Sequence, residues 1–186
     1  MQPIESTFSV PPFPAFPSVS RYVPLGSVQE TLNRVCRSID AREGVALVLG
    51  PPGTGKSLTC GLLADRYRES HDVVVLGDTP IKDSMAFQRH LLHRLGVNFE
   101  GTDASDLHLA LIDRVCDTDS PQGGLLILVD EAQSLCTEVI EAIRMATNSM
   151  REGQPRVFAV LCGKVTLEDT RVSTAMEAVS HRVSTR

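Results

Sequence analysis

This chain of 186 residues contains a glycine-rich run, Gly50-Pro51-Pro52-Gly53-Thr54-Gly55-Lys56-Ser57. The apolar run Val45 to Leu49 precedes it and is typical of a buried strand, and a helical pattern begins at Leu58. Between a strand and a helix, such a loop can curl its backbone N–H groups around phosphate oxygens, and the helix dipole favours negative charge. The spacing therefore predicts a nucleoside triphosphate site over residues 50–58, in which Lys56 and Ser57 contact phosphates and Mg²⁺. A plain turn with a stray lysine is the alternative interpretation.

A second apolar run, Leu125 to Val129, ends in the acidic pair Asp130-Glu131. A parallel strand covered on both faces tolerates carboxylates only at its carboxyl end, where the ligand crevice of an open α/β sheet lies. There Asp130 can hold Mg²⁺ through its water shell, and Glu131 can orient and deprotonate the water that attacks the γ-phosphate. We expect the loop and this pair to face one cavity. Alternatively, one of the acids caps a helix that begins near Thr137, or lies in a solvated loop.

Composition favours a water-soluble domain of one core. The chain is 42% hydrophobic and carries a net charge of −5. No stretch approaches the roughly 18 apolar residues of a membrane span, and no secretory signal is evident, so we expect a cytoplasmic location. The acidic balance opposes a uniformly basic nucleic-acid surface but leaves room for local arginine clusters. The five cysteines lack any C-x-x-C pair and favour reduced thiols: Cys36, Cys60, Cys116, Cys136 and Cys162.

Strands and helices alternate along the chain, which predicts a mostly parallel α/β sheet. Residues 1–24 hold six of the eleven prolines and are expected to form a strap over the core or a disordered tail. Residues 25–186 are expected to form the core. Further strands are predicted at 73–76 and 156–161, and helices at 27–41, from Leu58 onward, around 87–95, around 107–117 and from about 137.

With the glycine-rich run and Leu128-Val129-Asp130-Glu131-Ala132-Gln133 both present, the chain resembles an AAA+ ATPase. The D-E-A-Q segment is similar to that of the general secretion pathway protein A ATPases and of the related transposition ATPases. The resemblance implies a three-layer α/β/α P-loop NTPase fold with ATP and Mg²⁺ as ligands. It also implies the roles already argued for Lys56, Ser57, Asp130 and Glu131.

The resemblance extends to two segments nearer the carboxyl end. His181-Arg182-Val183 resembles a Q-R-I element whose arginine reaches the nucleotide of a neighbouring subunit, which implies a homo-oligomer with Arg182 as a catalytic residue supplied in trans. In such proteins the fourth strand commonly runs into V-G-Q and carries a polar sensor residue. Here Leu161-Cys162-Gly163-Lys164 places a lysine at the glutamine position, so the sensor is left unassigned.

The family order of strands, 5-1-4-3-2, requires a fifth strand and then a helical lid after Arg182. Neither fits in the few residues that remain, so we expect a chain truncated before the fifth strand and the lid. Residues 45–49 would then be an apolar edge strand, which another chain or a missing segment would have to cover.

The resemblance favours an ATP-binding and hydrolysing molecular switch, acting in a nucleotide-dependent oligomer of the general secretion type. The alternatives are a DNA-associated regulatory ATPase of the transposition type and a nucleotide-binding regulator without turnover. A small-molecule kinase would use the same phosphate loop, but the adjacent Asp130-Glu131 favours water activation. The sequence leaves open the protein partner and the choice between ATP and GTP.

Overall fold

The computed structural model describes residues 19, 22–24, 26–77, 80–99, 103–164 and 184–185. Its central layer is a five-stranded sheet in the order β2-β3-β6-β1-β7, and each neighbouring pair is parallel. The strands of this sheet are β1 (Val45–Leu49), β2 (Asp72–Leu76), β3 (Leu125–Val129), β6 (Val157–Gly163) and β7 (Ser184–Thr185). The α-helices are α1 (Gly26–Asp40), α2 (Lys56–Tyr67), α3 (Ser84–Arg94), α4 (Ala104–Cys116) and α5 (Thr137–Ala146).

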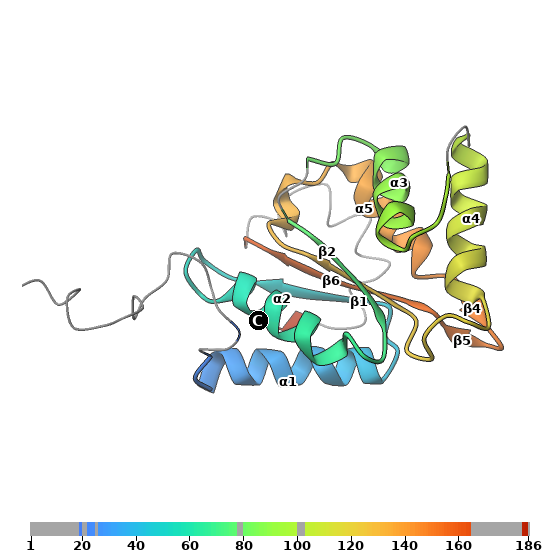
Figure 1. Cartoon of the computed structure of the whole chain (residues 1–186). Coiled ribbons are helices and arrows are strands. Elements are labelled where there is room, and N and C mark those ends of the chain that lie inside the picture. Colours follow the sequence, from blue (N-terminus) through green and yellow to red (C-terminus); the bar gives the residue numbers. More distant parts are fainter. Residues whose placement is uncertain are drawn as a thin grey trace, which may run out of the picture.

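Helices cover both faces of the sheet (Figure 1). Helices α1 and α2 lie on one face, where Val35 and Leu63 belong to the same buried cluster as Leu128. Helices α3, α4 and α5 lie on the other face, where Leu91 and Leu111 belong to a second cluster. The predicted three-layer α/β/α fold with a parallel sheet is therefore confirmed.

Strand β3 shows why an unbroken apolar run folds this way. All five of its residues are buried. Because side chains alternate between faces, Leu126 and Leu128 belong to the α1–α2 cluster, whereas Leu125, Ile127 and Val129 belong to the other. A strand that is buried on both faces tolerates no polar side chain along its length. The first polar residue, Asp130, accordingly comes directly after the end of β3.

The structure corrects the expectation that the chain ends before a fifth strand. Residues of β7 pair parallel with β1, Ser184 opposite Leu47 and Thr185 opposite Val48. Backbone hydrogen bonding over two residues needs no apolar pattern, so the pairing left no signal in the sequence. Strand β1 is consequently covered along Leu47 and Val48, and the order of strands is the one that the family resemblance implies.

A short hairpin outside the main sheet was not predicted from the sequence. Strands β4 (Met150–Arg151) and β5 (Gln154–Pro155) form an antiparallel hairpin whose turn holds Glu152 and Gly153 at positive φ.

The segment 1–24, expected to be a strap or a tail, lies outside the described residues except for residues 19 and 22–24. Val19 lies against α2, because its Cγ2 is 3.1 Å from the position that a Cβ on Gly61 would take. In the described part of the chain, no helix has the length and apolarity needed to cross a bilayer.

Gly124, just before β3, is expected to tolerate no side chain. Its φ is +87°, and a Cβ there would lie 2.2 Å from the carbonyl oxygen of Arg156. Gly153 has a similar φ of +75° but nothing within 4 Å, so Gly153→Ala should cost about 1–2 kcal/mol from backbone strain alone. Gly124→Ala should cost about 4 kcal/mol or more in urea unfolding. Equal losses in the two variants would contradict this packing.

Candidate functional site

The glycine-rich loop joins the carboxyl end of β1 to α2 and is tied to the neighbouring strand. The N–H of Gly50 donates to the carbonyl oxygen of Gly163 at the end of β6, at 3.2 Å. Gly53 and Gly55 have φ values of +81° and +87°, which favour glycine. A Cβ on Gly55 would also meet Val28 of α1 at 3.2 Å, so the loop lies close to the start of that helix.

Lys56 folds back over its own loop. Its side chain is buried, and Nζ donates to the carbonyl oxygens of Gly50 at 3.0 Å and Pro51 at 2.8 Å. The first turn of α2 holds no acidic residue, so the helix dipole and the lysine charge act together without an opposing carboxylate. The side chain of Ser57 beside it is exposed, and Leu58 is half-buried. This arrangement can receive an anion.

The acidic pair lies directly after β3. The N–H of Asp130 donates to the carbonyl oxygen of Leu76, and one carboxylate oxygen of Asp130 accepts from the N–H of Glu131 at 3.0 Å. Glu131 has φ 53° and ψ 45°, a left-handed conformation that costs a non-glycine residue about 1–2 kcal/mol. The N-cap position of α5 is Cys136, so the alternative in which one of these acids caps that helix is wrong.

Gln133 connects the acidic pair to the end of β6. Its Nε2 donates to a carboxylate oxygen of Glu131, and its Oε1 accepts from the N–H of Lys164 at 3.1 Å. The glutamine therefore links the carboxylate of Glu131 to the main chain at the end of β6. Sequence reasoning used Gln133 only as a family marker, because its link to Lys164 depends on how β3 and β6 pair.

Strand β6 sets the distance between the loop and the acids. It pairs with β1, Gly163 opposite Leu49, and with β3, Leu161 opposite Val129. The carboxyl ends of β1 and β3 therefore meet one edge of the sheet. They lie two strand spacings, or about 10 Å, apart across the sheet, and β1 extends two residues, or about 7 Å, further along it. An Mg²⁺-bound triphosphate is large enough to extend across such a gap.

The thiol of Cys162, at the end of β6, lies within electrostatic reach of both segments. Its hydrogen bond with Cys60, whose Sγ is 3.2 Å away, and burial raise the pKa of Cys162. The negative charge of Asp130 raises this pKa further, whereas the positive charge of Lys56 lowers it. The charges of Lys56 and Asp130 thus both influence this thiol. As predicted, the five cysteines are free thiols.

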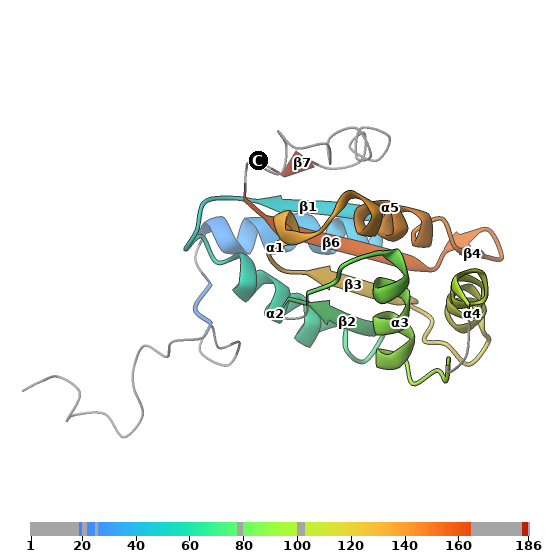
Figure 2. The same cartoon turned by 90° about the horizontal axis from the view of Figure 1, so that it is seen from above.

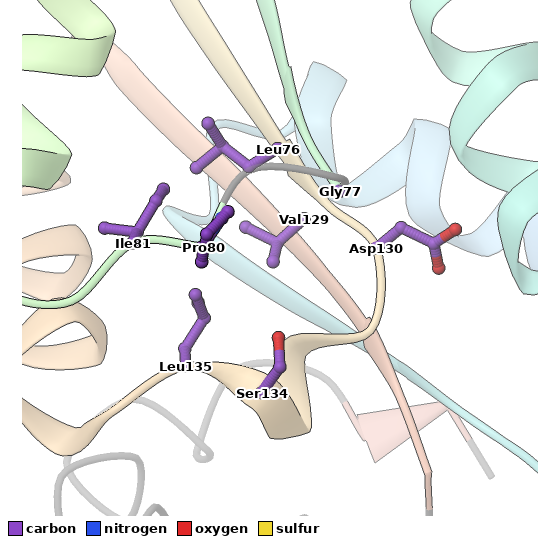
Figure 3. Close-up of a pocket in the computed structure, with 8 residues that line it drawn as sticks. All are labelled: Leu76, Gly77, Pro80, Ile81, Val129, Asp130, Ser134 and Leu135. Atoms are coloured by element: carbon purple, nitrogen blue, oxygen red, sulfur yellow. The ribbon is translucent and has the colours of Figure 1, made fainter.

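The loop and the acids border two different pockets. Lys56 and the start of α1 line a pocket of about 210 Å³. Asp130 borders another of about 290 Å³ at the ends of β2 and β3, and Figure 3 shows its carboxylate pointing away from the apolar side chains of Ile81 and Leu135. Neither of these pockets is lined by both segments, so the expectation that the loop and the acidic pair face one cavity is not confirmed. Residues 51–54 and Glu131 are exposed at the carboxyl ends of β1 and β3.

Mg²⁺ has few protein ligands to draw on here. Among the residues that the structure describes, no group of three or more His, Cys, Asp or Glu side chains could hold a metal ion. In nucleotide sites Mg²⁺ uses one or two protein oxygens together with phosphate oxygens and water. Ser57 and Asp130 fit that requirement and stay the predicted ligands. The predicted catalytic residue Arg182 lies outside the described residues.

Comparisons with known proteins relate this chain to a family and to a solved structure. A family model described as an AAA domain matches residues 39–170, which include both the loop and the acidic pair. Among solved structures, Cdc6p from Pyrobaculum aerophilum matches with a TM-score of 0.68 and 20% sequence identity, over 88% of this chain and 46% of that one. At this identity the match shows the fold alone, and the present chain spans less than half the length of that protein. Curated protein sequences give no significant match.

Proposed function

The chain belongs to the AAA domain family of AAA+ ATPases, and from that premise we propose that it is an ATP-driven molecular switch that hydrolyses ATP. The observation that carries the proposal is the common edge of the sheet at which the loop after β1 and the acids after β3 both end. We infer that it works in the cytoplasm.

In this proposal the loop binds the phosphates of ATP. The N–H groups of residues 50–57 surround the phosphate oxygens, and the glycines allow the close approach. Lys56 exchanges the carbonyl oxygens of Gly50 and Pro51 for phosphate oxygens, which carry far more negative charge. Ser57 and Asp130 would hold Mg²⁺, which when bound would supply charge neutralisation for the transferred phosphoryl group.

Glu131 is the proposed general base. Its carboxylate is exposed at the rim and is oriented by Gln133, so it can hold a water molecule and take its proton. The left-handed backbone at Glu131 is the kind of strain that proteins retain at sites of function. An exposed base beside Asp130 suits attack by water, which favours hydrolysis over transfer to a bound acceptor.

The switch acts, in our proposal, within a nucleotide-dependent oligomer of the general secretion type. Arg182 would enter the nucleotide site of the next subunit and stabilise the charge that develops on the phosphoryl oxygens. The resemblance of residues 181–183 to the Q-R-I element supports this assignment. Nucleotide binding would order the oligomer, and hydrolysis would relax it.

Substitution of the lysine and of the base should separate binding from hydrolysis. Lys56→Ala removes charge-assisted hydrogen bonds worth about 1.5–3 kcal/mol each, so ATP should bind at least about 10-fold more weakly in calorimetry. Glu131→Gln should keep ATP affinity while turnover falls by about 10²–10⁴-fold. Lys82→Ala, at an exposed lysine, is the control and should change neither. An equal loss of binding in Lys56→Ala and Glu131→Gln would contradict the roles assigned.

Gln133 should act as a positioning residue. Gln133→Ala frees the carboxylate of Glu131 to rotate, so steady-state turnover should drop by about 10-fold or more while the Kd for ATP is unchanged. Gln154→Ala makes the same change at an exposed position of the β4–β5 hairpin and should leave turnover intact. A variant at Gln133 with normal turnover, or one that loses ATP binding instead, would refute the positioning role.

A further inference from the structure

A polar pocket of about 330 Å³ lies beside the β4–β5 hairpin, and three arginines line it: Arg42, Arg151 and Arg156. They come from the turn after α1, from β4 and from the residue before β6. Figure 2 shows this hairpin at the end of the sheet opposite the loop that joins β1 to α2. The pocket is therefore separate from the proposed nucleotide site.

Main-chain carbonyl groups hold all three guanidinium groups in place. Arg156 is buried, and its Nε, Nη1 and Nη2 donate to the carbonyl oxygens of Val115, Gln122 and Pro121 at 3.2, 2.8 and 2.7 Å. Arg42 donates to the carbonyl oxygen of Pro155 at 3.2 Å, and Arg151 donates to that of Asp117 at 2.7 Å. These bonds fix the cations but bring no negative charge to neutralise them.

The three positive charges are close enough to repel one another. Burial lowers the pKa of Arg156, and the charges of Arg151 and Arg42 lower it further. Asp72 raises this pKa, but its carboxylate forms an ion pair with Arg114 at 2.9 Å. Three charges of one sign around a single hollow are destabilising unless an anion enters it.

One acid borders the pocket and only partly offsets the arginines. The Glu152 carboxylate lies 4.0 Å from Nε of Arg151, and its side chain is 84% exposed, so water screens the interaction strongly. The other lining residues are uncharged hydroxyl and amide side chains. The lining thus has an excess of positive charge in a chain whose net charge is −5.

We propose that this arginine pocket binds the oxygens of a phosphate group. Guanidinium groups present planar forks of N–H donors that match phosphate oxygens. Arg42 and Arg151 each use one Nη atom to bond a main-chain carbonyl, and a guanidinium group has further N–H donors beyond that one. Arg156 is the fixed cation at the back of the pocket. The phosphate comes either from a free small compound or from the backbone of a nucleic acid, because both present the same oxygens. This inference does not depend on ATP hydrolysis at the other edge.

The test is a titration with inorganic pyrophosphate at constant ionic strength. It uses a Lys56→Ala background, in which the glycine-rich loop should bind phosphate only weakly. Pyrophosphate should bind, and Arg42→Gln with Arg151→Gln should weaken it by at least about 10-fold. Arg89→Gln with Arg94→Gln, at two exposed arginines of α3, makes the same change of net charge and should have no effect. Arg156 is left intact because its three carbonyl bonds support the fold.

A second arm uses a short DNA duplex in the same backgrounds. If the backbone of a nucleic acid is the source, DNA binds and the double variant lowers the dependence of log K on log salt by about 2. The proposal is supported if either probe binds to the α3 control variant but not to the Arg42→Gln, Arg151→Gln variant. The double variant could fold poorly, and hydrogen exchange of the Lys56→Ala variant alone then tests the site. Slower exchange of residues 118–122 and 150–156 with either probe present would support the proposal equally. Absence of binding and of protection with both probes would overturn it, as would equal binding in the two double variants.

Discussion

Parallel pairing of β1 and β3 on either side of β6 is the constraint on which the rest of the structure depends. Because all three strands run the same way, the loop after Leu49 and the acids after Val129 are delivered to one edge. The apolar side chains of β3 and β6 enforce this pairing, since each strand is buried from both faces and could not shift by one residue without exchanging its two sets of side chains. The fold thus sets the spacing of the proposed site before any ligand binds.

Two polar residues at that edge, Lys56 and Glu131, adopt arrangements that lower the stability of the fold. The ammonium of Lys56 is bound by carbonyl oxygens alone, and Glu131 is kept in a left-handed conformation beside Gln133. The arrangement of Lys56 is less favourable than it would be with a ligand present, because phosphate would offer its ammonium group a full negative charge. At the opposite end of the sheet, the three arginines of the pocket beside the hairpin likewise carry more positive charge than nearby acids neutralise. In both places where we propose that phosphate binds, main-chain carbonyl groups hold the cations, and at the arginine pocket Glu152 offsets the positive charge only in part.

Sequence reasoning located the strands 45–49 and 125–129 within their observed bounds, because each is an unbroken apolar run next to a motif. It placed the start of α2 two residues late, since Lys56 and Ser57 already belong to the helix that Gly55 precedes. Strand β7 and the β4–β5 hairpin were missed because two-residue pairings are made by the backbone and leave no periodic pattern. The contact of Gln133 with Lys164 joins residues 31 positions apart and follows from topology rather than from local sequence. The arginine pocket was hidden for the same reason.

The central claim is that the glycine-rich loop and the acidic pair act on one metal-bound nucleotide. The most direct measurement is a crystal structure of the Glu131→Gln variant with ATP and Mg²⁺. We expect a triphosphate within residues 50–57, Lys56 on its oxygens, and a metal ion between Ser57 and Asp130. A nucleotide bound away from this loop, or a metal ion too far from Asp130 to contact it directly or through one water molecule, would contradict the account.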